Sequence, residues 1–384
     1  MIRRLAVLLF FAAFFIPAAV YAGDYMKEAG EQFARQDFKS ALANYDKVLA
    51  GDPKNAEAYF KRANTKNYLG DFDGAMDDFD AAIAIAPSKA EYYFGRGLLK
   101  NYLGDYDGAV KDMSENIELS KNNPRAEAYY LKAVSEYYLD ENAAAARDVA
   151  EAVALNPRYA DAYNLRSTLG NIKGDYKGAI EDITAAISIE PADVTFRYNR
   201  ALLNEKLKNY DSALKDLDEA VKLEPSYAVF KLRGRLKLSA DRYAEAEQDF
   251  GEALKYNQED ADLYFQRAAA RTGMKKFSDA IKDYDEAISL NPSFAAAYHD
   301  RGSAKNNMGK YASALSDFRK AGELDPSIEF LQENIKTAQK NLDRYMAFYE
   351  RLAAWIFICA AAAFFIRRRI KNKKLYDDSK NAPK

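Results

Sequence analysis

The chain has 384 residues, of which 49% are hydrophobic and 30% are charged, a composition typical of a folded protein rather than a disordered one. One Cys and one His exclude an intrachain disulfide and are too few for a His-based metal site or catalytic centre. The net charge is −2 and both ends are basic, so the stretch between them is acidic, which argues against nucleic-acid binding.

Residues 1–22 have the pattern of a secretory signal peptide. Arg3 and Arg4 precede an apolar stretch, and Val20 and Ala22 are small or tolerated residues where a signal peptidase reads the chain. The apolar core is short for a membrane span, so an uncleaved anchor is the weaker alternative. The sequence therefore predicts export and cleavage after Ala22.

A 34-residue repeat occupies residues 23–328. The stretch KNYLGDFDGA begins at Lys66, and KNYLGDYDGA begins at Lys100. Aligning the chain with itself at this period gives nine units, which begin at Ala22, Ala56, Ala90, Ala126, Ala160, Val194, Tyr227, Ala261 and Ala295. In each unit two blocks with helical spacing of apolar residues flank a turn signal, so each unit predicts a helix-turn-helix.

The recurring letters resemble those of the tetratricopeptide repeat (TPR) family. Counted from the start of each unit, position 4 is usually aromatic (Tyr59, Tyr93, Tyr129), position 8 is small (Ala63, Gly97, Ala133) and position 20 is Ala (Ala75, Ala109, Ala145). The resemblance implies an all-α, right-handed superhelical solenoid of nine helix-turn-helix units. It also implies that the first helices line a concave groove that binds a protein or peptide partner, without a cofactor.

Two charged positions vary together across the units. Position 7 is a cation and position 23 is Asp in the second to ninth units, whereas the first unit has Glu28 and Asn44 there. Antiparallel helices joined by a turn near position 15 bring these positions to one level, so we predict a structural ion pair within each unit. The predicted pairs are Arg62–Asp78, Arg96–Asp112, Lys132–Asp148, Arg166–Asp182, Arg200–Asp216, Arg233–Asp249, Arg267–Asp283 and Arg301–Asp317.

An aromatic and amide-rich strip occupies positions that face the groove in the family. Aromatic rings and amides suit an extended peptide, and they also suit a glycan; packing against the neighbouring unit is a further interpretation of the rings. The candidate partner-binding residues are Phe60, Asn64, Asn67, Tyr68, Phe94, Asn101, Tyr102, Tyr130, Tyr137 and Tyr138.

The repeats contain no motif for a catalytic or metal site. A phosphate-binding loop, an HExxH motif and paired cysteines are absent from the sequence, and the acidic turns lack the ligand order of a calcium loop. We expect His299 to be a surface side chain beside Asp300. The sequence thus predicts no catalytic residue, no metal and no cofactor, and disfavours an enzyme.

The C-terminal part predicts a membrane anchor. Residues 329–351 continue the helical pattern and predict a helix that caps the array, and residues 352–366 are apolar throughout. Residues 367–384 are basic, which predicts a cytoplasmic tail by the positive-inside rule. The expected protein is a single-pass membrane scaffold whose body is extracytoplasmic, in a bacterial periplasm. The alternatives are an envelope-glycan binder and an accessory subunit of a secretion or envelope-assembly complex.

Overall fold

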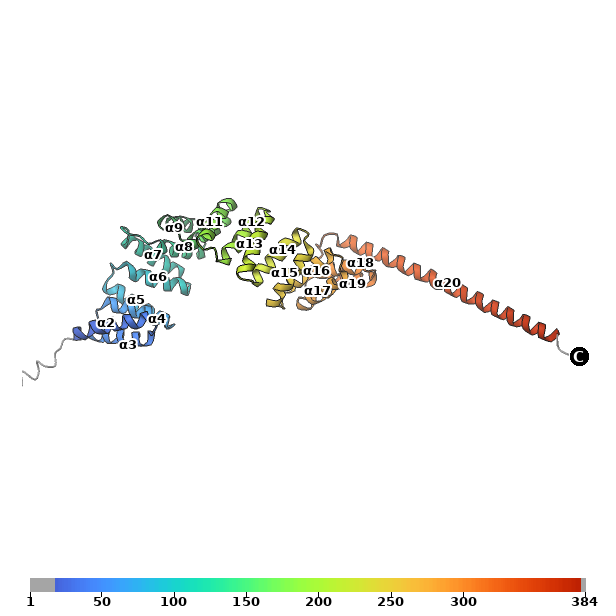
Figure 1. Ribbon diagram of the computed structural model, residues 1–384, viewed down its shortest axis with the longest axis horizontal. Coiled ribbons are helices and arrows are strands. Elements are labelled where there is room, and N and C mark those ends of the chain that lie inside the picture. Colours follow the sequence, from blue (N-terminus) through green and yellow to red (C-terminus); the bar gives the residue numbers. More distant parts are fainter. Residues whose placement is uncertain (1–17, 381–384) are drawn as a thin grey trace, which may run out of the picture. The chain divides into compact units, whose positions relative to one another are not determined.

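The computed structural model describes residues 18–380, and it describes side chains from 23 to 372. These residues form an all-α array of nineteen helices, which confirms the predicted fold class, and they divide into two compact units, 18–208 and 209–380 (Figure 1). The predicted leader lies largely outside the described residues. The first helix begins at Ala18, so the predicted cleavage site lies within a helix.

The first of these two compact units, residues 18–208, contains the helix pairs of five repeats and the first helix of the sixth repeat. Its helices are α2 (Ala18–Ala34), α3 (Phe38–Gly51), α4 (Ala56–Tyr68), α5 (Phe72–Ile85), α6 (Ala90–Leu103), α7 (Tyr106–Leu119), α8 (Ala126–Tyr138), α9 (Asn142–Leu155), α10 (Ala160–Lys173), α11 (Tyr176–Ile189) and α12 (Val194–Lys206).

The second unit begins with the second helix of the sixth pair and ends in a long helix. Its helices are α13 (Tyr210–Leu223), α14 (Tyr227–Ser239), α15 (Tyr243–Tyr256), α16 (Ala261–Gly273), α17 (Phe277–Leu290), α18 (Ala295–Asn307), α19 (Tyr311–Leu324) and α20 (Leu331–Lys380).

Within each unit, every helix packs against its neighbours in the chain. The two helices of a repeat contact each other, as α4 and α5 do, and the second helix also contacts the first helix of the next repeat, as α5 and α6 do. First helices of successive repeats also meet, since α4 contacts α6 and α6 contacts α8. The first helices therefore form a row, which we call the A-helix row.

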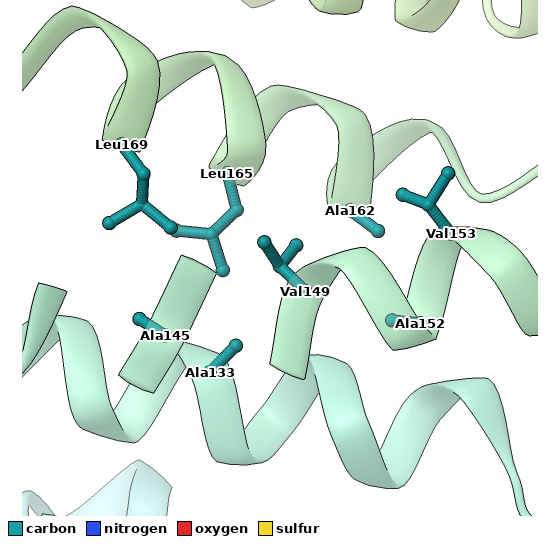
Figure 2. Close-up of a cluster of buried hydrophobic side chains, with 8 residues drawn as sticks. All are labelled: Ala133, Ala145, Val149, Ala152, Val153, Ala162, Leu165 and Leu169. Atoms are coloured by element: carbon teal, nitrogen blue, oxygen red, sulfur yellow. The ribbon is translucent and has the colours of Figure 1, made fainter. Parts of the chain in front are cut away.

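Small residues allow the helices to pack closely. Figure 2 shows Leu165 and Leu169 of α10 pointing toward Ala145 and Val149 of α9, with Ala133 of α8 beside them. The alanines are fully buried, so a larger side chain there would have to displace its neighbours. The small residues at positions 8 and 20 are thus explained by packing between helices.

Position 15 of all nine repeats has a positive φ angle, the left-handed conformation that ends the first helix. Four repeats use Gly there, at Gly70, Gly104, Gly174 and Gly309. The other five use Gln36, Asp140, Lys208, Asp241 and Lys275, with φ between 57° and 62°. Glycine adopts this conformation with little strain, whereas other L-residues incur a free-energy cost.

The predicted capping and membrane segments form a single helix. α20 begins at Leu331, two residues later than the predicted cap, because Phe330 adopts a positive φ of 58° in the preceding turn. Leu331 and Ala338 are buried against α19, whereas residues 352–366 are almost entirely exposed. By length and composition, α20 is the one helix among the described residues that could cross a membrane.

Candidate functional site

The cation at position 7 and the aspartate at position 23 lie in contact. Arg62 donates from Nε and Nη2 to the two carboxylate oxygens of Asp78, at 2.8 and 2.7 Å. The same two-atom contact recurs at Arg96–Asp112, Arg166–Asp182, Arg233–Asp249, Arg267–Asp283 and Arg301–Asp317. Lys132 contacts Asp148 at 2.7 Å. The Arg200–Asp216 pair stays a prediction.

Two further positions of the repeat complete this charge network. Position 11 supplies a second cation to the aspartate, in Lys66–Asp78, Lys100–Asp112, Lys237–Asp249, Arg271–Asp283 and Lys305–Asp317, at 2.7 to 2.9 Å. Position 25 supplies an aspartate to Nη1 of the arginine in the next repeat, in Asp46–Arg62, Asp80–Arg96, Asp218–Arg233 and Asp285–Arg301, at 2.6 to 2.9 Å.

Positions 11 and 25 were not predicted as parts of the network, although their charged residues recur at the 34-residue period. At these four junctions the network links one repeat to the next, and the position-7 and position-23 pairs join the two helices within a repeat. The hydrogen bonds that Arg62 donates, above all the one to Asp78, raise the pKa of its guanidinium above the usual value. The buried aspartates and their arginines neutralise each other, which explains why charges can occupy the core between helices.

The tyrosines at position 13 lie between neighbouring repeats. Tyr68 stacks on Phe38 of the preceding repeat, with ring centroids 4.9 Å apart and an interplanar angle of 6°. Tyr138 stacks on Tyr106 in the same way, at 4.7 Å and 9°, and Tyr102 meets Phe72 at 5.4 Å. Tyr68, Tyr102 and Tyr138 are nevertheless 66%, 72% and 58% exposed. Each ring therefore packs against the preceding repeat while much of its surface stays open to a partner.

The aromatic residues at position 5 are more enclosed. Phe60 contacts Tyr92 of the next repeat at 4.9 Å, and Tyr130 contacts Tyr159 at 4.8 Å. Burial raises the pKa of Tyr130 to about 12. Phe94 lies under the guanidinium of Arg125. These contacts are those of the packing interpretation, and the three rings offer a partner less surface than the tyrosines of position 13.

The amides along the A-helix row are partly engaged with the protein itself. Asn64 donates to the carbonyl oxygen of Phe60 at 2.9 Å, and Asn101 donates to Ser135 Oγ of the next repeat at 2.8 Å. The side chain of Asn67 is half-buried and makes no hydrogen bond to the described residues. Tyr137 is half-buried and packs against Tyr138.

Two hollows open on the A-helix row of the first unit. One of about 440 Å³ lies between α2 and α4, and the predicted residues Asn64 and Tyr68 line it with Gly30, Phe33, Tyr45 and Lys61. The other, of about 230 Å³, lies between α10 and α12 and is lined by Ser167, Thr168, Asn171, Asn199, Leu202, Leu203 and Lys206. The first combines rings, an amide and a cation, a chemistry that suits a peptide.

His299 is not the surface side chain that we expected. Its Nδ1 contacts Asp300 and its Nε2 contacts Asn334 of α20, both at 2.9 Å, and the side chain is largely buried. The imidazole therefore bridges the last repeat and the long helix. Asn334 lies outside the repeats, which is why the repeat pattern did not reveal this role. The described residues contain no cluster of side chains that could hold a metal ion.

Comparisons with known proteins agree with the repeat pattern. Models of the tetratricopeptide repeat match residues 26–90, 130–189 and 173–228, residues 261–294, and residues 295–328, together more than half of the chain. No curated protein matches it.

Several solved structures are similar over part of the chain. MamA is 28% identical, with 42% of this chain and 94% of that chain covered and a TM-score of 0.40. YrrB, described as a TPR protein with an unusual peptide-binding site, is 20% identical, with 52% and 97% covered and a TM-score of 0.43. A TPR protein from Parabacteroides merdae is 21% identical, with 65% and 98% covered and a TM-score of 0.46. Because all three TM-scores are below 0.5, the assignment depends on the repeat models. The chain belongs to the tetratricopeptide repeat family and is a protein-interaction scaffold of that family.

Proposed function

We propose that this scaffold is exported, is held at a membrane by residues 352–366, and binds a peptide segment of a protein partner along the A-helix row. The main support for the proposal is the exposure of α20. The start of this helix packs on the last repeat, whereas its later part presents an apolar, exposed surface. Exposing so many large apolar side chains to water is unfavourable, and a bilayer would remove them from it.

The residues on either side of the apolar segment support this placement. Tyr345, Phe348 and Tyr349 are exposed just before it, and aromatic residues are enriched where a helix enters a membrane. Arg367, Arg368 and Arg369 follow it directly and suit the cytoplasmic side. Long basic side chains at the ends can also reach the interface, which helps a short apolar segment to span.

The hollow between α2 and α4 supports the peptide-binding part of the proposal. Tyr68 lines this hollow, and the exposed part of its ring can cover an apolar side chain. Asn67, the preceding residue of α4, is not part of the lining, but its amide is free to pair with a peptide N–H or C=O group. A partner held here needs no change in the ion-pair network, which lies between the helices.

Site-specific photocrosslinking of the full chain in its membrane tests the proposed surface. A benzophenone amino acid at Asn67 should form an adduct with a polypeptide. The same group at Lys111, exposed on the second helix α7, should not form that adduct. A carbohydrate adduct at position 67 would instead support the envelope-glycan alternative. Failure to crosslink at 67, or equal crosslinking at both sites, would contradict the proposal.

A further inference from the structure

The junction between the fourth and fifth repeats lacks one member of the charge network. At four other junctions the Nη1 atom of the position-7 arginine contacts an aspartate at position 25 of the preceding repeat. The residue at that place before Arg166 is Ala150. Arg166 binds Asp182 through Nε and Nη2, and its Nη1 has no carboxylate partner among the described residues.

A cavity of about 650 Å³ adjoins this arginine, between α9 and the pair α10 and α11. In five repeats, position 11 carries a Lys or Arg that binds the position-23 aspartate, but here it is Gly170. At the junction of the seventh and eighth repeats, Arg271 pairs at 2.8 Å with Glu247, whose counterpart in the fourth repeat is Ala146. Gly170 and Ala146 thus stand where the eighth and seventh repeats have the charged pair Arg271 and Glu247.

The cavity leaves Arg166 more accessible than its counterparts. The Arg166 side chain is 33% exposed, against 14% to 19% for Arg62, Arg96, Arg233, Arg267 and Arg301. The unused Nη1 donor therefore lies where a molecule from outside can reach it.

The other lining residues define what can enter the cavity. Lys173 adds a second cation without a carboxylate partner, and Leu169 and Ile172 provide apolar walls. Asp182 lines the cavity too, but both of its carboxylate oxygens accept hydrogen bonds from Arg166.

Two more polar side chains line the cavity. The Oδ1 atom of Asn142 is buried and has no hydrogen-bond partner, so it needs a donor. Asp175 caps α11 by accepting from the amide of Gly178. The chemistry as a whole suits an occupant with a carboxylate, a short apolar stem and a nearby N–H group.

We propose that this cavity binds an aspartate or glutamate side chain of a protein partner. Its carboxylate takes the place of the missing position-25 aspartate against Arg166 Nη1 and Lys173, and a backbone N–H beside it donates to Asn142. The inference rests on the proposed function in that a partner protein supplies the acid, but the cavity is separate from the hollow between α2 and α4.

Methyl NMR on the full chain in detergent micelles tests the cavity without the partner. Ile172 lines the cavity, so the signal of its δ1 methyl group serves as the report of occupancy. An acetylated and amidated Ala-Glu-Ala peptide should shift this signal saturably, whereas the matching Ala-Gln-Ala peptide should not. Lys173→Gln should weaken binding of the glutamate peptide. Ala150→Asp, which restores the internal partner of Arg166, should weaken it by at least about tenfold.

A matched variant separates this effect from a general change in charge. Gly251→Asp places an aspartate at position 25 before Arg267, which does not line the cavity, and should leave the titration unchanged. No saturable shift, an equal response to the glutamine peptide, or unchanged affinity in Ala150→Asp would overturn the inference. Peptide binding in the cavity together with failed crosslinking at Asn67 would reject only the proposed surface.

Discussion

Position 11 of the repeat determines how each buried aspartate is neutralised. Most repeats place Lys or Arg there, but the fourth places Glu136, which is buried against Lys132 and Asp148. Lys132 contacts Asp148 at 2.7 Å and Glu136 at 3.4 Å, and Glu136 Oε2 has no hydrogen-bond partner. Two carboxylates therefore share one cation here, whereas five other repeats have two cations for one carboxylate.

This arrangement makes the fourth repeat sensitive to pH. Burial first, and then the charge of Asp148, raise the pKa of Glu136 to about 7. Between the ordinary glutamate pKa and pH 7, the folded protein binds a proton that the unfolded chain does not, so stability falls as pH rises through this interval. Stability lost in this way returns when the pH is lowered.

Replacing Glu136 by Lys should remove this sensitivity. Glu136→Lys restores the usual pattern, and we expect it to stabilise α8 and α9 by about 1–3 kcal/mol at pH 8 and by clearly less at pH 5. Hydrogen exchange measured by mass spectrometry on peptides from these helices gives the local free energy of opening. Glu127→Lys, at an exposed site on α8, is the control and should change little. An equal gain at both pH values would refute this explanation.

Recurrence in the sequence was enough to predict the partner of most position-7 cations. Arg62 and Asp78 were paired because their types vary together over the repeats, and the two are in contact. The aspartates of position 25, such as Asp46, also recur over the repeats, so the same comparison could have predicted their contacts. The raised pKa of Glu136 could not be predicted, since it depends on burial.

The helix pairs follow directly from the repeat pattern, and so does the turn between them. What the pattern did not reveal is that position 15 is left-handed even where the residue is not glycine, as at Lys275 with φ of 59°. Geometry there is imposed by packing of both helices, which outweighs the local preference of the residue. The start of α20 was misplaced for the same kind of reason, because Phe330 also adopts a positive φ.

Glycine at such a position should stabilise its repeat. Lys275→Gly removes the strain of a left-handed lysine, and this benefit is partly offset by the greater freedom of glycine in the unfolded chain. We therefore expect the free energy of unfolding to rise by about 1 kcal/mol. Thermal melting followed by circular dichroism measures it. Glu286→Gly, at an exposed site inside α17, is the control and should lose about 1 kcal/mol. A loss in both variants would show that position 275 is not strained.

At the scale of the whole molecule, our proposal places the repeat array in water and residues 352–366 of the long helix in a lipid bilayer. The repeats bury their apolar side chains internally, whereas residues 352–366 bury almost none. Under this proposal, export and tethering put the array on one side of the membrane and the basic tail on the other. The sequence alone predicted this arrangement from its two ends.

Cysteine labelling can test this topology, because Cys359 is the one cysteine of the chain and lies within the apolar segment. In a Cys359→Ser background, single cysteines replace Lys177 in the array or Lys371 in the tail, both of which are exposed. A membrane-impermeant maleimide added to bacterial cells with a permeabilised outer membrane should label position 177 and should reach 371 only after lysis. Native Cys359 should stay unlabelled until the membrane is dissolved and the protein denatured, and removal of residues 352–384 should release the array from the membrane. Labelling of position 371 in unlysed cells, or an array that stays in the membrane fraction without its last helix, would show that α20 does not span a bilayer.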